Sequence, residues 1–226
     1  MTAQVEITLP ASAGKALAGR AHLREELGRL FELQVELLKP ATEAALQASS
    51  LLGQTVTLKL ETGEDAPRFV SGMVVRFAQG ALSQRFRSYH VEVRPRLWLL
   101  TRNAGCRIFE NQTVVQILDT LFAAHGLQVD KAQIGSGYAS RVICVQYRET
   151  DFAFVSRLME EEGIFYYFKH EDGKHTLVLG DDPGDHLAVP HETKAKFVAD
   201  EGDVFTTPED TLMVTLLKKA GEALKG

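Results

Sequence analysis

Acidic and histidine side chains gather in one short stretch of the chain, where they could hold a divalent metal ion. The stretch contains Asp181, Asp182, Asp185 and His186, and His191 follows nearby. Carboxylate oxygens and imidazole nitrogens are suitable ligands for such ions. The spacing matches no defined metal motif, and acids beside glycine and proline are typical of a solvated loop. A metal-dependent hydrolase built on Asp181, Asp185 and His186 therefore stands only as an alternative, and the prediction is that the chain holds no metal.

Other sequence patterns for catalysis are missing. No serine lies in a G-x-S-x-G context, and no glycine-rich phosphate loop is present. The two cysteines, Cys106 and Cys144, are far apart and form no CxxC pair, which argues against a zinc site or a disulfide scaffold. We therefore expect no catalytic residues and no cofactor, and we predict that this chain is not an enzyme.

Composition narrows the choice of partners and location. The net charge of −5 lacks the basic surplus of a dedicated nucleic-acid binder, and the 45% hydrophobic content is ample for a packed core. No segment approaches the roughly 20 apolar residues of a membrane span, and the first residues lack a signal-peptide pattern. These features predict no nucleic-acid partner, no membrane insertion and a cytoplasmic location.

Three consecutive acids stand where a helix would disfavour them. Glu160, Glu161 and Glu162 lie at the carboxyl end of a predicted helix, where the macrodipole opposes negative charge by about 0.3 to 1 kcal/mol each. Arg157 could relieve part of this cost one turn away, which leaves an ordinary solvated face as one interpretation. The other interpretation is a subunit interface, in which this acidic patch meets arginines of a neighbouring chain, chiefly Arg94, Arg96 and Arg107, with Arg85, Arg87 and Arg102 close to them in sequence.

Residues 1–100 are predicted to form a small antiparallel β-barrel. Alternating apolar residues predict strands at 4–9, 31–38, 55–60, 69–77 and 86–100. A polar link is expected directly after the first strand, and the spacing of Leu23, Leu27 and Leu30 before the second strand also fits a helix. Residues 43–50 are interpreted as a brief helix. Gly72, inside a strand, indicates a bend or a close backbone approach.

Residues 101–190 are predicted to form an α+β domain inserted after the barrel, which makes the fold class α+β. After a connector at 101–110, Thr113 caps one helix; after a strand at 141–147, Thr150 caps a second, which Gly163 ends. A hairpin at 164–179 turns at Asp172-Gly173. Residues 191–226 are expected to form a short tail, with a strand at 193–198 and a terminal helix at about 209–224.

Four sequence blocks occur in a fixed order: RPRLWLLT at 94–101, RIFENQTV at 107–114, QYRETD at 146–151 and RLMEEEGIFYYF at 157–168. Leu52-Gly53 and residues 69–72 precede them. In order and spacing these blocks resemble the amino-terminal, phage-tail-hub-like region of the VgrG family, the spike proteins of type VI secretion. The resemblance covers approximately residues 31–182.

The resemblance implies a structural role without catalytic residues. In that family the region forms a homotrimeric hub that joins a tail tube to a spike and seeds tube assembly in a contractile injection machine. Expected partners are the tube protein, separate spike or baseplate proteins, and secreted effector cargo, with export by the contractile machine itself. A stand-alone adaptor that docks cargo or baseplate proteins is the alternative of the same kind.

Overall fold

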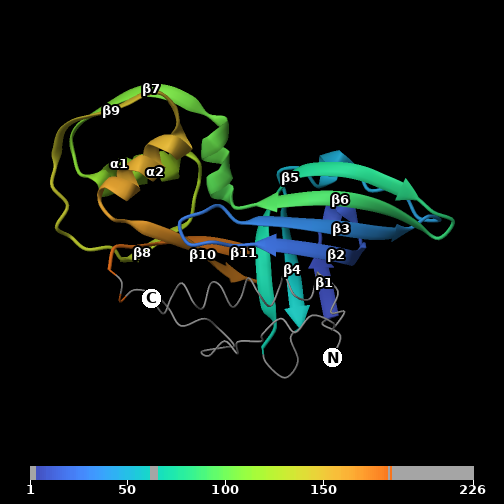
Figure 1. Ribbon diagram of the computed structural model, residues 1–226. Helices are drawn as coiled ribbons and strands as arrows, with labels where there is room; N and C mark the ends of the chain where they lie inside the picture. The colour runs from blue at the N-terminus through green and yellow to red at the C-terminus, as the bar shows by residue number, and fades with distance from the viewer. Residues whose placement is uncertain (1–3, 62–65, 183, 185–226) are drawn as a thin grey trace, which may run out of the picture.

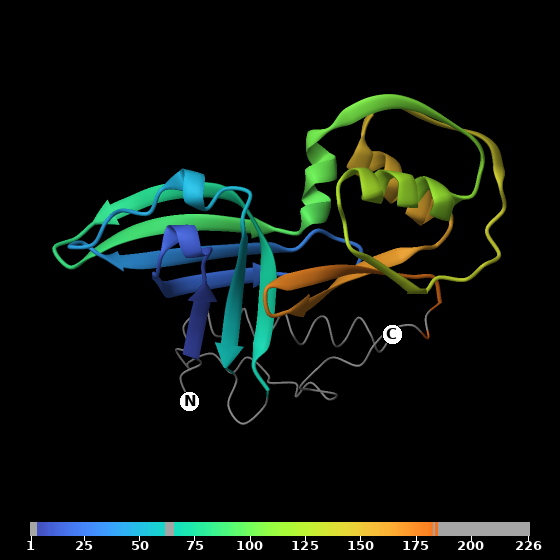
Figure 2. The ribbon, with the colours of Figure 1, turned by 180° about the vertical axis from the view of Figure 1, so that it is seen from behind.

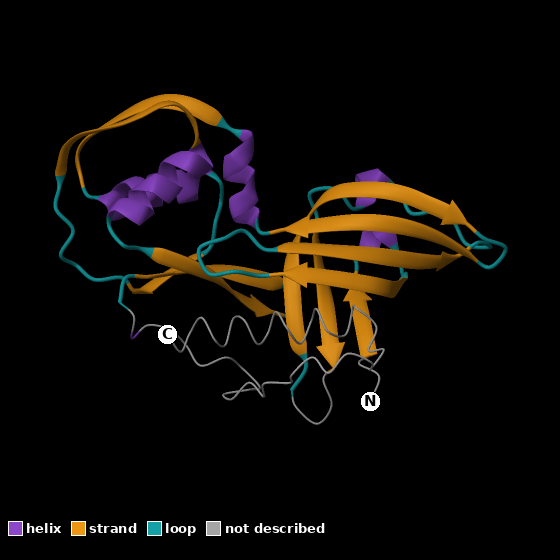
Figure 3. Cartoon of the chain, viewed as in Figure 1, coloured by secondary structure: helices purple, strands orange, loops and turns teal. Residues whose placement is uncertain are grey.

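The computed structural model describes residues 4–61, 66–182 and 184 and shows a strand-rich chain with two α-helices among those residues (Figures 1 and 3). The elements in the first part are β1 (Gln4–Thr8), β2 (Leu17–Arg24), β3 (Glu32–Pro40), β4 (Thr55–Glu61), β5 (Arg68–Leu82), β6 (Phe86–Arg94) and the 3-10 helix η3 (Arg96–Arg102). Those that follow are β7 (Ala104–Gln112), α1 (Val114–Ala124), β8 (Val129–Gln133), β9 (Arg141–Thr150), α2 (Asp151–Glu161), β10 (Phe165–Glu171) and β11 (Lys174–Gly180).

The first six strands form a nearly closed antiparallel barrel. Their order within the described residues is β1-β4-β5-β6-β3-β2, and β1 at one end lies against β2 at the other. Inward-facing residues of the strands, with Phe31, make one apolar core, whose fully buried members include Leu33, Leu37, Leu58, Leu60 and Tyr89. The predicted barrel is confirmed, with its strands turning around this core (Figures 1 and 2).

β5 is the corner strand of the barrel, because its first half pairs with β4 and its second half with β6. Gly72 lies where the strand turns. A Cβ atom at this position would stand 2.7 Å from Cγ1 of Val93 and 2.9 Å from Cζ of Phe31. The bend or close backbone approach predicted from the sequence is therefore confirmed, and any side chain here would force the barrel core apart.

The second part of the chain builds a separate apolar cluster around the two helices. The antiparallel pair β7–β9 arches over α1 and α2 (Figure 1). Residues from both helices fill the space beneath it, with Phe109 of β7 stacked on Phe154 of α2 at 5.6 Å. Thr113 caps α1 in a reciprocal capping box with Gln116, as its sequence context suggests.

The β10–β11 hairpin connects the two parts. β11 also pairs in parallel with β8, so these three strands form their own sheet. Phe168 packs against both apolar clusters, and the His170 ring lies 4.9 Å from that of Phe31. The amide of Gly173, in the hairpin turn, donates to Oγ1 of Thr57 in β4. The hairpin is therefore fastened to the barrel at its tip.

Four sequence interpretations were wrong in detail. The supposed link before residue 31 contains β2, and residues 43–50 are mostly irregular, with a 3-10 turn only at Ala48–Ser50. The predicted strand at 86–100 ends at Arg94, because Pro95 interrupts the ladder and the chain continues as η3. The supposed connector at 101–110 is mostly the strand β7. β8 had no strand signal, because it is short and its apolar residues are few.

The predicted tail, including its strand at 193–198 and its helix at 209–224, lies outside the described residues. The division of the chain near residue 100 stays a prediction. Among the helices that the structure describes, none has the length and apolar character needed to cross a bilayer.

Candidate interaction surface

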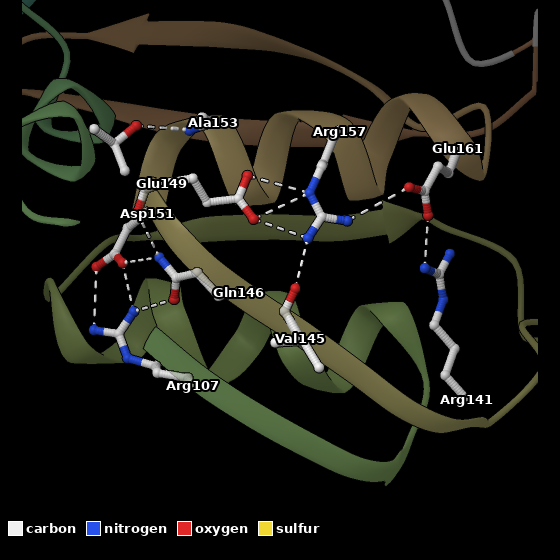
Figure 4. Close-up of polar contacts among 10 residues, drawn as sticks. Arg107, Arg141, Val145, Gln146, Glu149, Asp151, Ala153, Arg157 and Glu161 are labelled. Atoms are coloured by element: carbon white, nitrogen blue, oxygen red, sulfur yellow. Dashed lines mark hydrogen bonds and ion pairs between the residues drawn. The ribbon is translucent and has the colours of Figure 1, made fainter. Parts of the chain in front are cut away.

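The amino end of α2 is organised by a buried aspartate. Thr150 caps the helix by accepting a hydrogen bond from the amide of Ala153, and the side chain of Asp151 is fully buried. Its carboxylate pairs with Arg107 and accepts a 2.7 Å hydrogen bond from Nε2 of Gln146 (Figure 4). Nε2 of His125 lies 3.1 Å from the same carboxylate. Burial alone would raise the pKa of Asp151, but the hydrogen bonds from Arg107, Gln146 and His125 lower it to about 2. The network ties β7, β9 and both helices together.

The acids at the other end of α2 are also paired within the chain. Arg141, at the start of β9, places one guanidinium nitrogen 2.6 Å from Glu161 and another 2.6 Å from Glu162. These bonds hold the pKa of Arg141 above its ordinary value. Glu160 is exposed and has no ion pair among the described residues. Arg141 thus offsets much of the unfavourable charge at this helix end, which the sequence left unexplained.

Arg157 offsets the negative charge at the carboxyl end of α2 less than its position one turn away in the sequence suggests. Its contact with Glu161 is 3.5 Å long, whereas its main partner is Glu149 of β9 at 2.8 Å (Figure 4). Its Nη2 also donates to the carbonyl oxygen of Val145 at 2.8 Å, which fastens α2 to β9. A bulge at Arg148, with a φ of 51°, turns Glu149 toward α2 for this pairing.

The six residues proposed for a subunit interface do not form one surface cluster. Arg94 pairs with Glu32 and Glu92 on the barrel, at 2.6 and 2.8 Å. Arg107 is committed to Asp151, and Arg141 neutralises Glu161 and Glu162. Of these six residues, only Glu160 and Arg96 have exposed charged groups with no ion pair among the described residues. Whether any of the six lies at an interface stays a prediction.

The outer side of the β7–β9 sheet is apolar and exposed, which the sequence interpretation missed. Four large side chains lie on this side, and they are defined here as the apolar face: Ile108 (68% exposed), Ile143 (63%), Val145 (42%) and Tyr147 (65%). Ile108 and Val145 are direct cross-strand neighbours. Glu110 stands at one end of the face, opposite Ile143, and the Arg148 guanidinium lies over the Tyr147 ring at the other end. Contiguous exposed apolar side chains of this kind mark interaction surfaces.

Part of the acidic loop considered for a metal is described, and its first residue has a structural role. Asp181 accepts hydrogen bonds from the amide of Gly135 at 2.8 Å and from the hydroxyl of Tyr138 at 2.5 Å. These bonds, chiefly the one from Tyr138, lower the pKa of Asp181. Asp185, His186 and His191 lie outside the described residues. Within the described ranges, no group of three histidine, cysteine or acidic side chains is placed to hold a metal ion.

A nearly closed antiparallel barrel followed by a two-helix α+β unit is the architecture of phage tail hub proteins. The E. coli c3393 protein, a component of the type VI secretion system with structural similarity to the T4 tail proteins gp27 and gp5, superposes with a TM-score of 0.71 and 26% identity. That comparison covers 80% of this chain and 50% of the other.

Sequence comparison defines the family. Residues 24–214 match the family model of the phage tail baseplate hub (GPD), and the chain belongs to that family. It is 47% identical over 163 residues to the type VI secretion system spike protein VgrG1c of Pseudomonas aeruginosa, and 42% identical over 190 residues to VgrG1b of the same organism. These alignments cover 72% and 84% of this chain but only 22% and 25% of the relatives. The resemblance to the amino-terminal region of VgrG spike proteins is thereby confirmed.

Proposed function

We propose that this chain assembles as a homotrimeric hub, which joins the tail tube to the spike of a type VI secretion machine and seeds tube assembly. The tube protein, spike or baseplate proteins and effector cargo are its partners in this proposal. The role is mechanical and uses no catalytic residue. Assembly takes place in the cytoplasm, and the contractile machine exports the hub with its cargo.

The observation that carries the proposal is the apolar face on β9 and β7. Complete burial of one large apolar side chain stabilises by about 1.5 to 3 kcal/mol, so the four partly exposed side chains of the face together offer on the order of 5 kcal/mol. Association itself costs about 4 to 15 kcal/mol. A single such contact would therefore be weak. A closed ring is favoured, because three subunits make three contacts for only two association steps.

The neighbouring subunit covers this face in the ring. Ile108, Ile143 and Val145 would then leave water, while Glu110 and Arg148 at the two ends of the face fix its orientation by their opposite charges. The acidic-patch hypothesis fits the same ring if Glu160 lies at the rim of the contact. Glu160 is the suitable residue for a charge-reversal test, because its substitution breaks no ion pair among the described residues.

Mass measurement by multi-angle light scattering tests the hub role, with the tube protein present and absent. The expected result is a mass of three chains for the protein alone and a larger mass when the tube protein is present. Glu160→Lys should weaken the trimer if the acidic patch lies at its rim, and Asp130→Lys on β8 provides the matched charge reversal elsewhere. A chain that stays monomeric both with and without the tube protein contradicts the proposed function.

A further inference from the structure

Arg96 has an uncommitted guanidinium above a pocket. Its backbone amide donates to Nε2 of His175 at 3.0 Å, but its side chain makes no hydrogen bond or ion pair among the described residues. The pocket has a volume of about 280 Å³ and lies where η3, the start of β4, the α1–β8 loop and the β10–β11 hairpin meet. Figures 1 and 2 show the β10–β11 hairpin reaching the barrel.

The pocket combines an apolar floor with a cationic rim. Its apolar lining residues are Leu97, Leu127, Phe168 and Leu177. Arg96 and Lys174 supply its positive charges, and no aspartate or glutamate is among the described residues that line it. Lys174 is partly compensated by Glu171 outside the pocket, at 2.7 Å, so Arg96 is its main unbalanced charge.

Two glycines are among the residues that line the pocket, Gly126 after the end of α1 and Gly173 in the turn of the β10–β11 hairpin. At each, an added Cβ atom would meet no atom within 4 Å, and both residues have a positive φ. These two positions therefore add no side-chain bulk to the lining of the pocket.

His175 forms a neutral wall of the pocket. Its Nε2 accepts a hydrogen bond from the backbone amide of Arg96 and is thus unavailable as a hydrogen-bond donor to an anion. Burial, together with the charges of His170 and Arg96, lowers the pKa of His175 to about 4. At neutral pH the attraction for a negative group thus comes from Arg96 and, more weakly, from Lys174.

We propose that this pocket binds the carboxyl terminus of a partner polypeptide whose last residue is apolar. A carboxyl-terminal residue carries an anionic group and an apolar side chain on the same Cα, which matches a cation and an apolar floor sharing one small pocket. An internal apolar residue lacks the charge, and an aspartate or glutamate side chain lacks the apolar part. The volume is just below the 300 to 1,000 Å³ or so of drug-sized ligand sites, so it suits about one residue.

The pocket is separate from the proposed trimer contact, because it shares no residue with the apolar face. Loss of peptide binding in a chain that still forms trimers, or the reverse, therefore identifies which of the two proposals has failed.

Fluorescence anisotropy with short labelled peptides of glycine and serine tests the pocket. The peptides end in leucine, valine or phenylalanine, and each is made with a free carboxylate and with a terminal amide. The free acids should bind the full chain, and their amides should bind at least about tenfold more weakly, as expected for loss of a charge-assisted hydrogen bond. Equal binding of acid and amide overturns the proposal, as does failure of every free acid to bind.

Two substitutions locate the binding. Arg96→Glu should weaken the binding of the free-acid peptides at least about tenfold. Arg85→Glu, an equal charge change in the β5–β6 loop, should leave the affinity for these peptides unchanged. Thr55→Trp fills the pocket from the exposed start of β4 and should abolish binding. Circular dichroism checks that each variant is folded. A folded Arg96→Glu chain that binds like the unaltered protein contradicts the assignment.

Discussion

The outer faces of the two antiparallel sheets differ in the residues that meet across neighbouring strands. On the barrel, Gln34 stands opposite Glu92, and Glu36 stands opposite His90. On β7–β9 the corresponding cross-strand pair is Ile108 and Val145. Both sheets pack their inner faces on apolar residues, so the inner faces account for folding in both cases. The outer faces differ because water covers one, whereas in the proposed ring a neighbouring subunit covers the other.

The inner faces of the two sheets differ as well. The inward residues of the barrel strands are almost wholly apolar, whereas the inner side of β9 carries Gln146, which is fully buried and bonded to Asp151. A buried polar network is costly when one member is removed, because its partners keep their desolvation cost. The two regions should therefore respond differently to the same kind of substitution.

Asp151→Asn should give the largest loss of stability. It removes the charge that compensates Arg107, and we expect the free energy of unfolding to fall by about 3 kcal/mol. Urea denaturation followed by circular dichroism measures this. Glu92→Gln, which removes a partly exposed partner of Arg94 on the barrel, is the matched control and should cost no more than about 1 kcal/mol. Equal losses from the two variants would remove the distinction between the regions.

His175, at the joint between the two regions, should make stability depend on pH. The pKa of His175 in the folded chain is about 4, below the ordinary value of 6.5. Between pH 4 and pH 6.5 the unfolded chain therefore binds more protons than the folded chain. Stability should therefore fall as pH drops from 6.5 to 4, by on the order of 2 kcal/mol from this group. His175→Gln, which retains an acceptor for the Arg96 amide, should flatten that part of the profile, and the exposed His22→Gln should not. An unchanged slope in His175→Gln would show that another group controls this window.

Arg141→Gln should have a smaller effect at the acidic end of α2. The ion pairs with Glu161 and Glu162 are partly exposed, so their loss should cost about 0.5 to 1 kcal/mol. Added salt screens such pairs, and the difference from the unaltered chain should shrink at high ionic strength. A loss as large as that of Asp151→Asn would mean that this helix end, too, depends on a buried network.

Ile143→Lys should change the stability of the single subunit least. The side chain is exposed, and the new lysine faces Glu110 across the strands, so the free energy of unfolding of the monomer should move by no more than about 0.5 kcal/mol. Phe109→Ala, on the inner face of the same sheet, should cost about 3 kcal/mol. Thermal and urea denaturation at low concentration compare the two. A large loss from Ile143→Lys would mean that the apolar face already packs within the subunit.

Sequence reasoning recovered the elements whose signals are local. The caps at Thr113 and Thr150, the stop at Gly163 and the turn at Asp172-Gly173 follow from side-chain and backbone preferences within a few residues. The close approach at Gly72 was also predictable, because a glycine weakens the interior of a strand unless a bend or a neighbouring group requires it there.

The interactions that the sequence did not reveal are long-range. Arg141 and Glu162 are 21 residues apart, and Arg107 and Asp151 are 44 apart, so no spacing rule connects either pair. The sequence did contain a pattern from which the apolar face could have been predicted. Residues 142–145 are apolar on both sides of the strand, a pattern typical of strands covered on both faces. That signal had to be combined with the position of β7, which was interpreted as a connector.

Sedimentation equilibrium of the unaltered chain and of an Ile108→Thr/Ile143→Lys double variant shows whether the apolar face holds three subunits together. A trimer is expected for the unaltered chain and a folded monomer for the double variant. Leu82→Lys, at an exposed leucine of the barrel, should remain trimeric. An unaltered chain that is monomeric at every concentration, or a double variant that remains a trimer, would contradict the claim that the apolar face of β7–β9 holds the hub together.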